Sequence, residues 1–267
     1  MSPVGDRFFS RFGCIPTSGC TVDKLEVHET GKLPRDAKVI IGIPDAGLVG
    51  LISASHLIES LSMEEVASFD SEAFPPIVVV HDGEPKSPMR AYSKGDLVVV
   101  ISEIAIQLPS VREVVRDLVS WIDGMGGALS ISLSGAPVPN RVDIDTPKVY
   151  GVSINIKDDL LSKIGVDRLQ EVMLVGPYAA VLEACRKAGT HNLTLLAQSH
   201  LQYPDPGAAA EALKAASGII GRKIDVQPLM EKAEEIRVRL RDVMRSTEKV
   251  MRESGKEREY ELPSMYV

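Results

Sequence analysis

Blocks of apolar residues along the chain predict strands and helices that alternate with each other. Short aliphatic runs at Val39–Ile43, Ile77–Val80 and Leu97–Ile101 predict strands. Continuous runs of this kind are typical of strands that are covered on both faces. Between the first two runs, Leu48–Leu61 places its apolar residues on one face at helical spacing, which predicts a helix.

The same alternation continues through the middle of the chain. Apolar residues recur at helical spacing from Val111 to Met125, and Ser110 with Glu113 predicts a capping box at the start of this helix. A cluster of glycines beginning at Gly124 predicts its end. Further strands are predicted at 128–133, 149–154, 172–175 and 193–197, and further helices at 178–188 and 208–220.

This order of elements predicts one α/β domain in three layers, α/β/α, with a mostly parallel or mixed sheet between helices. The length of 267 residues suits one large domain with an appendage. We expect a peripheral N-terminal segment over 1–36, an α/β core over 37–221, a C-terminal helical region over 222–251 and a flexible tail over 252–267.

The C-terminal third has a different pattern. From Leu229 to Val250, apolar or small residues recur at heptad spacing, which predicts one long helix packed against one partner. That partner is either the helix's own domain or another subunit. Beyond Met251, residues 252–261 are almost all charged, so we expect this stretch to be solvated and mobile.

The chain ends in Met265, Tyr266 and Val267, behind that charged stretch. An apolar side chain, an amphipathic ring and a terminal carboxylate can enter one narrow slot of another protein. Capture of a C-terminal carboxylate is a recurring mode of peptide recognition. These three residues are therefore the predicted partner-binding site.

Composition narrows the function classes. The net charge of −7 disfavours nucleic acid as the main partner, and no apolar run reaches the roughly 20 residues of a membrane span. Three scattered cysteines, Cys14, Cys20 and Cys185, suggest a reducing compartment, hence the cytoplasm. No spacing of cysteine and histidine predicts a metal, and no motif predicts a cofactor.

The glycine-rich turn from Gly42 to Gly50 is the candidate ligand turn, with Gly42, Gly47 and Gly50 as its members. It follows a strand and opens a helix, which is where phosphates and nucleotides bind in α/β enzymes. It contains neither a dinucleotide fingerprint nor a P-loop, and Asp45 would repel a phosphate. The turn therefore reads either as a tight strand-to-helix crossing or as the site of a small-molecule enzyme.

Polar residues near predicted strand ends are the other chemical candidates, since α/β sites gather there. Ser134 with Gly135 does not form a nucleophile elbow, and nothing in the sequence brings the carboxylates together. We therefore expect that this protein is not an enzyme. The candidate residues are Glu72, His81, Asp82, Glu84 and Glu103.

Four stretches together resemble the proteasome assembly chaperone family in its archaeal-type homomeric form. They lie in order at 42–50, 72–76, 134–137 and 203–210, and the similarity covers about residues 37 to 245.

The resemblance implies a three-layer fold like that of nucleoside phosphorylases, homo-oligomerisation, and binding to the α subunits of the proteasome core particle. It also implies a hydrophobic-Tyr-any tail, which Met265, Tyr266 and Val267 match. In that family's manner, the Val267 carboxylate would pair with a lysine of a pocket in the α ring. Some relatives carry an ATP-grasp label, for which this chain has no evident motif.

Overall fold

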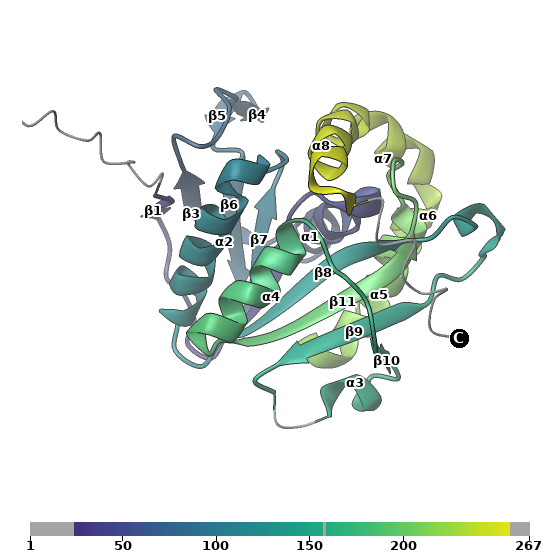
Figure 1. The fold of residues 1–267 in the computed structure, drawn as a ribbon. Helices are drawn as coiled ribbons and strands as arrows, with labels where there is room; N and C mark the ends of the chain where they lie inside the picture. The colour runs from purple at the N-terminus through teal and green to yellow at the C-terminus, as the bar shows by residue number, and fades with distance from the viewer. Residues whose placement is uncertain (1–23, 157–158, 257–267) are drawn as a thin grey trace, which may run out of the picture.

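The computed structural model describes residues 24–156 and 159–256, in which nine strands form one mixed sheet between two helical layers (Figure 1). The strand order is β1-β3-β6-β7-β2-β8-β11-β9-β10. The three-layer α/β/α class predicted from the sequence is confirmed. The strands are β1 (Glu26–Glu29), β2 (Lys38–Gly42), β3 (Glu64–Asp70), β6 (Met89–Lys94), β7 (Leu97–Ser102), β8 (Leu129–Pro137), β9 (Val149–Ile154), β10 (Asp167–Arg168) and β11 (His191–Ser199).

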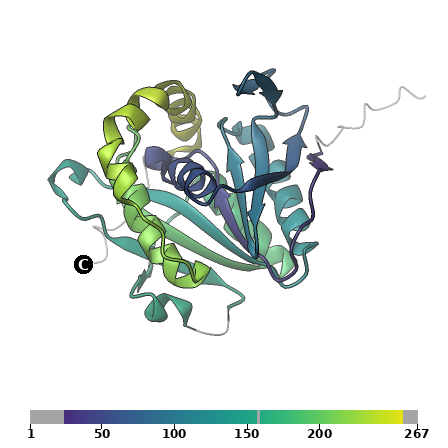
Figure 2. The same cartoon turned by 180° about the vertical axis from the view of Figure 1, so that it is seen from behind.

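Each face of the sheet is covered by a pair of helices. Helices α1 (Val49–Ser60) and α5 (Pro206–Ile220) contact each other on one face, which Figure 2 shows from behind. Helices α2 (Leu108–Asp123) and α4 (Pro177–Ala188) contact each other on the opposite face. The sheet therefore separates two apolar cores, each enclosed by one helix pair.

Four adjacent strands at the centre of the sheet, β7, β2, β8 and β11, run parallel. The chain proceeds from β2 to β7 on one side and then returns past β2 to β8 on the other. The order thus reverses between β2 and β8. In open α/β sheets such a switch point opens a crevice at the carboxyl ends of the strands, where ligands bind.

Two predicted strands are wrong. The run Ile77–Val80 is not a central strand, because Val78 and Val80 are each 64% exposed. This part of the chain instead forms a small separate hairpin of β4 (Val79–His81) and β5 (Glu84–Lys86). Residues 172–175 form no strand either, and Met173 is 55% exposed. In both places an aliphatic run without a covering layer was mistaken for a buried strand.

The predicted capping box of the second helix is also wrong. Helix α2 begins at Leu108, so Ser110 lies inside its first turn and cannot cap it. Gln107 stands at the cap position and makes no capping side-chain bond, and a proline follows in the first turn. The fixed backbone angle of proline suits a helix start, which explains why the helix begins earlier than expected.

The C-terminal helix predicted as one continuous element is broken twice. It consists of α6 (Gln227–Glu231), α7 (Ala233–Arg239) and α8 (Arg241–Ser254). The backbone leaves helical geometry at Lys232 (φ −100°, ψ 16°) and Leu240 (φ −92°, ψ 8°).

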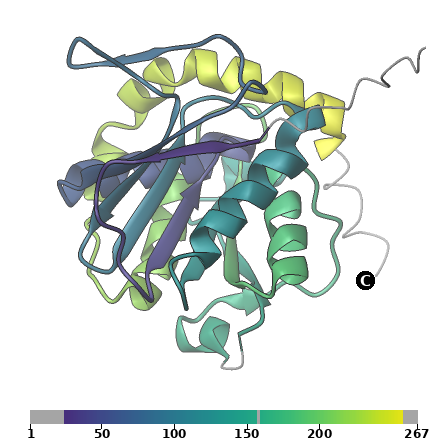
Figure 3. The ribbon, with the colours of Figure 1, turned by 90° about the vertical axis from the view of Figure 1, so that its left-hand side faces the viewer.

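This C-terminal arm packs on its own domain. Most of its heptad residues are buried there, although Ala233, Leu240 and Val243 are only partly buried. Helix α8 contacts both α2 and the 3-10 turn η1 (Ala46–Leu48) that follows β2. The arm therefore crosses the carboxyl ends of the parallel strands (Figure 3). Of the two expected partners, the structure shows the helix's own domain. The buried residues are Leu229, Ile236, Met244, Thr247, Val250 and Met251. Two further short helices complete the fold, η2 (Arg141–Asp143) and α3 (Leu160–Lys163).

Candidate functional site

The glycine-rich turn lies at the switch point, and packing accounts for its glycines. A Cβ atom at Gly42 would overlap Ala54, and one at Gly50 would overlap the Tyr178 hydroxyl. Gly47 has a positive φ of 62°, which glycine adopts without strain. These contacts support the tight strand-to-helix crossing among the two readings of the turn.

Tyr178 holds this crossing in place from α4. Its hydroxyl accepts a hydrogen bond from the amide of Ile43 (3.0 Å) and can donate to the carbonyl of either Ile43 or Ile41 (3.0 and 3.2 Å). Burial raises the pKa of the Tyr178 hydroxyl, so the group stays protonated and neutral. The end of β2 is thereby fixed to the helix layer behind it.

Asp45 lies at the switch point and its side chain is fully buried; we call the polar cluster around it the crevice. Ser134, near the end of β8, donates a hydrogen bond to Asp45 Oδ2 (2.9 Å). The ammonium of Lys256 donates to the same oxygen (2.8 Å) and to the carbonyl of Val175 (2.9 Å). The crevice thus joins Asp45 after β2, Ser134 on β8 and Lys256, which lies two residues beyond the end of α8.

Lys256 corrects the prediction that the whole charged stretch after Met251 is solvated. Helix α8 continues to Ser254, and the Lys256 side chain is only 1% exposed. Charge composition predicted a solvated segment because most charged side chains stay in water. The buried carboxylate that receives this one lies 211 residues away in the sequence, so local composition could not reveal it.

A second buried ion pair supports the loop after β11. Arg141 binds Asp205 through two nitrogens, at 2.7 and 2.9 Å. Asp205 also accepts from the amides of Ala208 (3.0 Å) and His200 (3.1 Å), so it caps α5. Desolvation lowers the pKa of His200, which packs edge-on against the ring of Tyr203. The proline-rich turn at 203–206 therefore has a structural role here.

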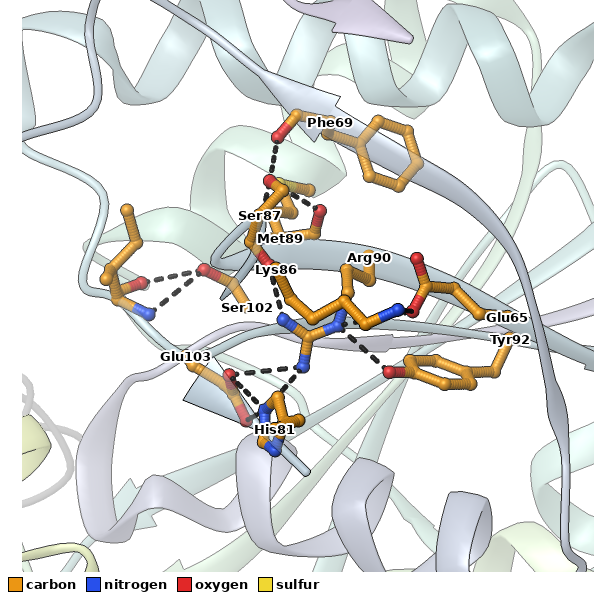
Figure 4. A network of polar contacts seen from close by, with 11 residues as sticks. Glu65, Phe69, His81, Lys86, Ser87, Met89, Arg90, Tyr92, Ser102 and Glu103 are labelled. Carbon is orange, nitrogen blue, oxygen red and sulfur yellow. Dashed lines mark hydrogen bonds and ion pairs between the residues drawn. The ribbon is translucent and has the colours of Figure 1, made fainter. Parts of the chain in front are cut away.

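A third polar cluster surrounds Arg90 on β6 (Figure 4). Its guanidinium donates to Tyr92 (2.9 Å), to Glu103 (3.1 Å) and to the carbonyl of Ser87. A fourth neighbour is His81 Nε2, 3.0 Å from Arg90 and 3.1 Å from Glu103. That ring nitrogen accepts from Arg90 when it is unprotonated and donates to Glu103 when it is protonated, never both at once.

The candidate carboxylates do not converge within the described part of the chain. Glu103 joins Arg90, whereas Glu84 pairs with Lys86 (3.4 Å) on the hairpin. Asp82 occupies the hairpin turn with a positive φ of 53°. Among residues 24–156 and 159–256, no group of acidic, histidine or cysteine side chains is arranged to hold a metal ion.

The predicted partner-binding residues Met265, Tyr266 and Val267 lie outside the described residues, as do Cys14 and Cys20. The third cysteine, Cys185, is a buried free thiol on α4, and burial raises its pKa to about 11.

Residues 39–244 match the PAC2 family. The chain belongs to the PAC2 family. The resemblance to proteasome assembly chaperones seen in the sequence is thereby confirmed.

Solved structures place this PAC2 chain beside two proteins of Pyrococcus furiosus. PbaA, an archaeal homolog of proteasome-assembly chaperone, is 27% identical, with a TM-score of 0.76 over 84% of this chain and 99% of its own. PbaB, an archaeal proteasome activator, is 24% identical, with a TM-score of 0.68 over 83% of this chain and 99% of its own, which shows a shared fold.

An uncharacterized protein of Methanocaldococcus jannaschii is 24% identical over 88% of this PAC2 chain and 98% of its own. Across the stretches 24–156 and 159–256, none of the helices combines the length and the apolar character needed to cross a bilayer.

Proposed function

We propose that this PAC2 protein is a non-enzymatic chaperone or activator of the proteasome that binds the core particle in the cytoplasm. Its likeness to PbaA, at 27% identity over 84% of the chain, is the observation that carries the proposal. PbaB, a proteasome activator with the same fold, supports the choice of partner.

The crevice at the switch point favours a binding protein over a small-molecule enzyme. In a nucleotide-binding fold this position offers backbone amides and a helix dipole to an anion. Here it holds the Asp45 carboxylate, which would repel phosphate, and the Lys256 ammonium already neutralises that charge. A phosphate or nucleotide would have to displace Lys256 and approach a buried carboxylate. The alternative function therefore requires a rearranged crevice.

We further propose that the last three residues make the contact with pockets between α subunits. The Val267 carboxylate would pair with a basic group, Tyr266 would bury its ring while keeping a hydrogen bond, and Met265 would fill an adaptable apolar niche. Ordering each tail residue costs about 1 kcal/mol or more, so one tail binds weakly. A homo-oligomer that presents several tails at once would recover affinity through effective concentration.

Deletion of residues 265–267 tests this contact. Binding to purified core particles should fall at least tenfold, while the melting temperature and the oligomeric state stay the same. Tyr266→Ala should weaken binding in the same direction, and Tyr260→Ala is the matched control. Full binding by the truncated protein would refute the tail contact. Failure of the intact protein to bind core particles would refute the proposed function itself.

A further inference from the structure

We propose that the crevice between β2 and β8 is a receptor for one primary ammonium group, and that Lys256 occupies it as a latch. The latch holds the end of α8 on the carboxyl ends of the strands. It also fixes the position of the residue that precedes 257–267, and the effect of this on binding rests on the proposed function.

The geometry around the ammonium is that of a built site. Asp45 Oδ2 and the Val175 carbonyl accept from Lys256 Nζ at 2.8 and 2.9 Å. Ser134 donates to the same carboxylate oxygen (2.9 Å) and so fixes its orientation. The Lys256 and Asp45 side chains are each 1% exposed, and a buried charge is tolerated only when it is paired and hydrogen-bonded.

The helix end directs the lysine inward. Gly255 adopts a left-handed φ of 73° and its amide bonds to the carbonyl of Arg252 (3.1 Å), which ends α8. A glycine in this conformation is a common helix stop. Because α8 is already seated through buried Val250 and Met251, the turn at Gly255 brings the next side chain to the crevice.

The chemistry of the crevice favours a compact ammonium over a guanidinium. A lysine ammonium is a point charge with donors in several directions, whereas arginine presents a flat fork suited to two parallel acceptors. Among residues 24–156 and 159–256, the acceptors are a carboxylate oxygen and a carbonyl from a different segment. Within the described chain, Asp45 Oδ1 is buried without a hydrogen-bond partner, so the carboxylate has a second oxygen that water does not reach.

Release of Lys256 would change how the tail is presented. Val250 and Met251 still hold α8, so the tether would lengthen by roughly five residues if its last turn frays. Effective concentration falls with about the −3/2 power of tether length, or about twofold for each tail. The loss multiplies in an oligomer that engages several tails together.

Chemical rescue tests the receptor directly. Lys256→Ala should lower the melting temperature by roughly 6–12 °C, because the Asp45 carboxylate is left buried without its cation. Millimolar n-butylammonium should restore part of that loss in the variant and have no effect on the natural protein. Butanol, tetramethylammonium and sodium chloride at equal concentration are the controls, and adding Asp45→Asn to the variant should abolish rescue.

If Lys256→Ala does not fold, Lys256→Met keeps the aliphatic stem and still lacks the ammonium, and the same amines are tested with Lys256→Gly expressed in their presence. An unchanged melting temperature in the alanine variant would overturn the latch. Equal shifts from n-butylammonium and tetramethylammonium would overturn the ammonium receptor.

The proposal that Lys256 fixes the start of the tail is tested by whether two changes have additive effects on binding. Inserting Gly-Ser-Gly-Ser-Gly between Lys256 and Glu257 should weaken core-particle binding about twofold per tail, as Lys256→Met does. Combined with Lys256→Met, the insertion should add less than in the natural protein. If the insertion weakens binding by the same factor with and without Lys256→Met, Lys256 does not fix the start of the tail.

A peptide of residues 257–267 separates the two ideas. If the peptide competes for core particles but Lys256→Met binds as well as the natural protein, the inference that Lys256 fixes the start of the tail fails and the proposed function stands. If neither the peptide nor the intact protein binds core particles, the proposed function fails.

Discussion

Two of the buried cations, Arg90 and Lys256, draw their partners from different parts of the sequence. Arg90 takes its hydrogen-bond partners from a nearby stretch of chain, with Ser87, Tyr92, Glu103 and His81 each within 13 residues of it, and Glu65 on β3 forms a longer ion pair with it (4.0 Å). Lys256 takes its carboxylate from Asp45, 211 residues away. The first cluster is built within one antiparallel region, whereas the second exists only after the C-terminal arm has docked.

Their access to water differs as well. The Arg90 side chain is 2% exposed, but its partners Glu103 and His81 are 22% and 45% exposed. The Lys256 pair is closed on both sides, at 1% for each residue. When the cation is removed, water can therefore reach the Glu103 carboxylate. The Asp45 carboxylate is closed to water and stays unpaired with any cation. The comparison predicts that the closed, long-range pair is the more sensitive of the two.

The largest effect is expected from Asp45→Ala. It leaves the Lys256 ammonium buried without its counter-ion, and we expect unfolding free energy to fall by about 3–5 kcal/mol. Urea unfolding followed by circular dichroism measures this loss. The double variant Asp45→Leu with Lys256→Met removes both charges and should recover most of it, because apolar replacement of a whole buried pair is often neutral. A loss below that of Arg90→Met would reverse the comparison.

Gly50→Ala tests whether the crevice depends on packing as well as charge. Its new methyl group would overlap the Tyr178 hydroxyl, so we expect a loss of about 3 kcal/mol from overpacking. Gly50 lies inside α1 without a positive φ, so backbone preference alone would favour alanine there and any loss reports the overlap. Gly83→Ala, at the hairpin turn, has open space but a φ of 81° and measures backbone strain without overlap. Unchanged stability of Gly50→Ala would mean that packing at the crevice contributes nothing.

Arg90→Met should cost less, about 2 kcal/mol, since the partly exposed Glu103 can turn to water. The methionine keeps most of the aliphatic volume, so the loss reports the polar contacts rather than a cavity. The same urea titration measures it. A loss as large as that of Asp45→Ala would show that the Arg90 cluster is as closed as the crevice.

The smallest effect is expected at the rim of the Arg90 cluster. His81→Ala should change unfolding free energy by less than about 1 kcal/mol, because a half-exposed charge contact contributes little. Glu103→Gln removes the charge but keeps the size, and it should lower the unfolding free energy by more than His81→Ala does. A larger loss for His81→Ala than for Glu103→Gln would place the histidine, not the carboxylate, as the main partner of Arg90.

Much of the fold was predictable from periodicity. The central strand β7 and the helices α1, α4 and α5 form where the spacing of apolar residues predicts them, because each has enough apolar residues of its own to form a buried face. The errors fall where burial depends on a distant segment. The aliphatic run at Ile77–Val80 has no layer above it and stays exposed, and the heptad pattern from Leu229 gave no sign of the breaks at Lys232 and Leu240.

The candidate site shows the same division. The glycines at 42, 47 and 50 were visible in sequence, but whether they serve a ligand or packing was open until Ala54 and Tyr178 were found against them. Asp45 was noted only as a residue that would repel phosphate, and its pairing with Lys256 was not foreseen. Lys256 was missed altogether, since a lysine in a charged stretch looks like any solvated residue.

The sequence by itself determined the three-layer class and the family, because these follow from spacing and local motifs. Only the tertiary structure decided which charges leave water. A buried ion pair needs two partners brought together from anywhere in the chain, and for Asp45 and Lys256 the docking of the arm across the strand ends supplies that contact.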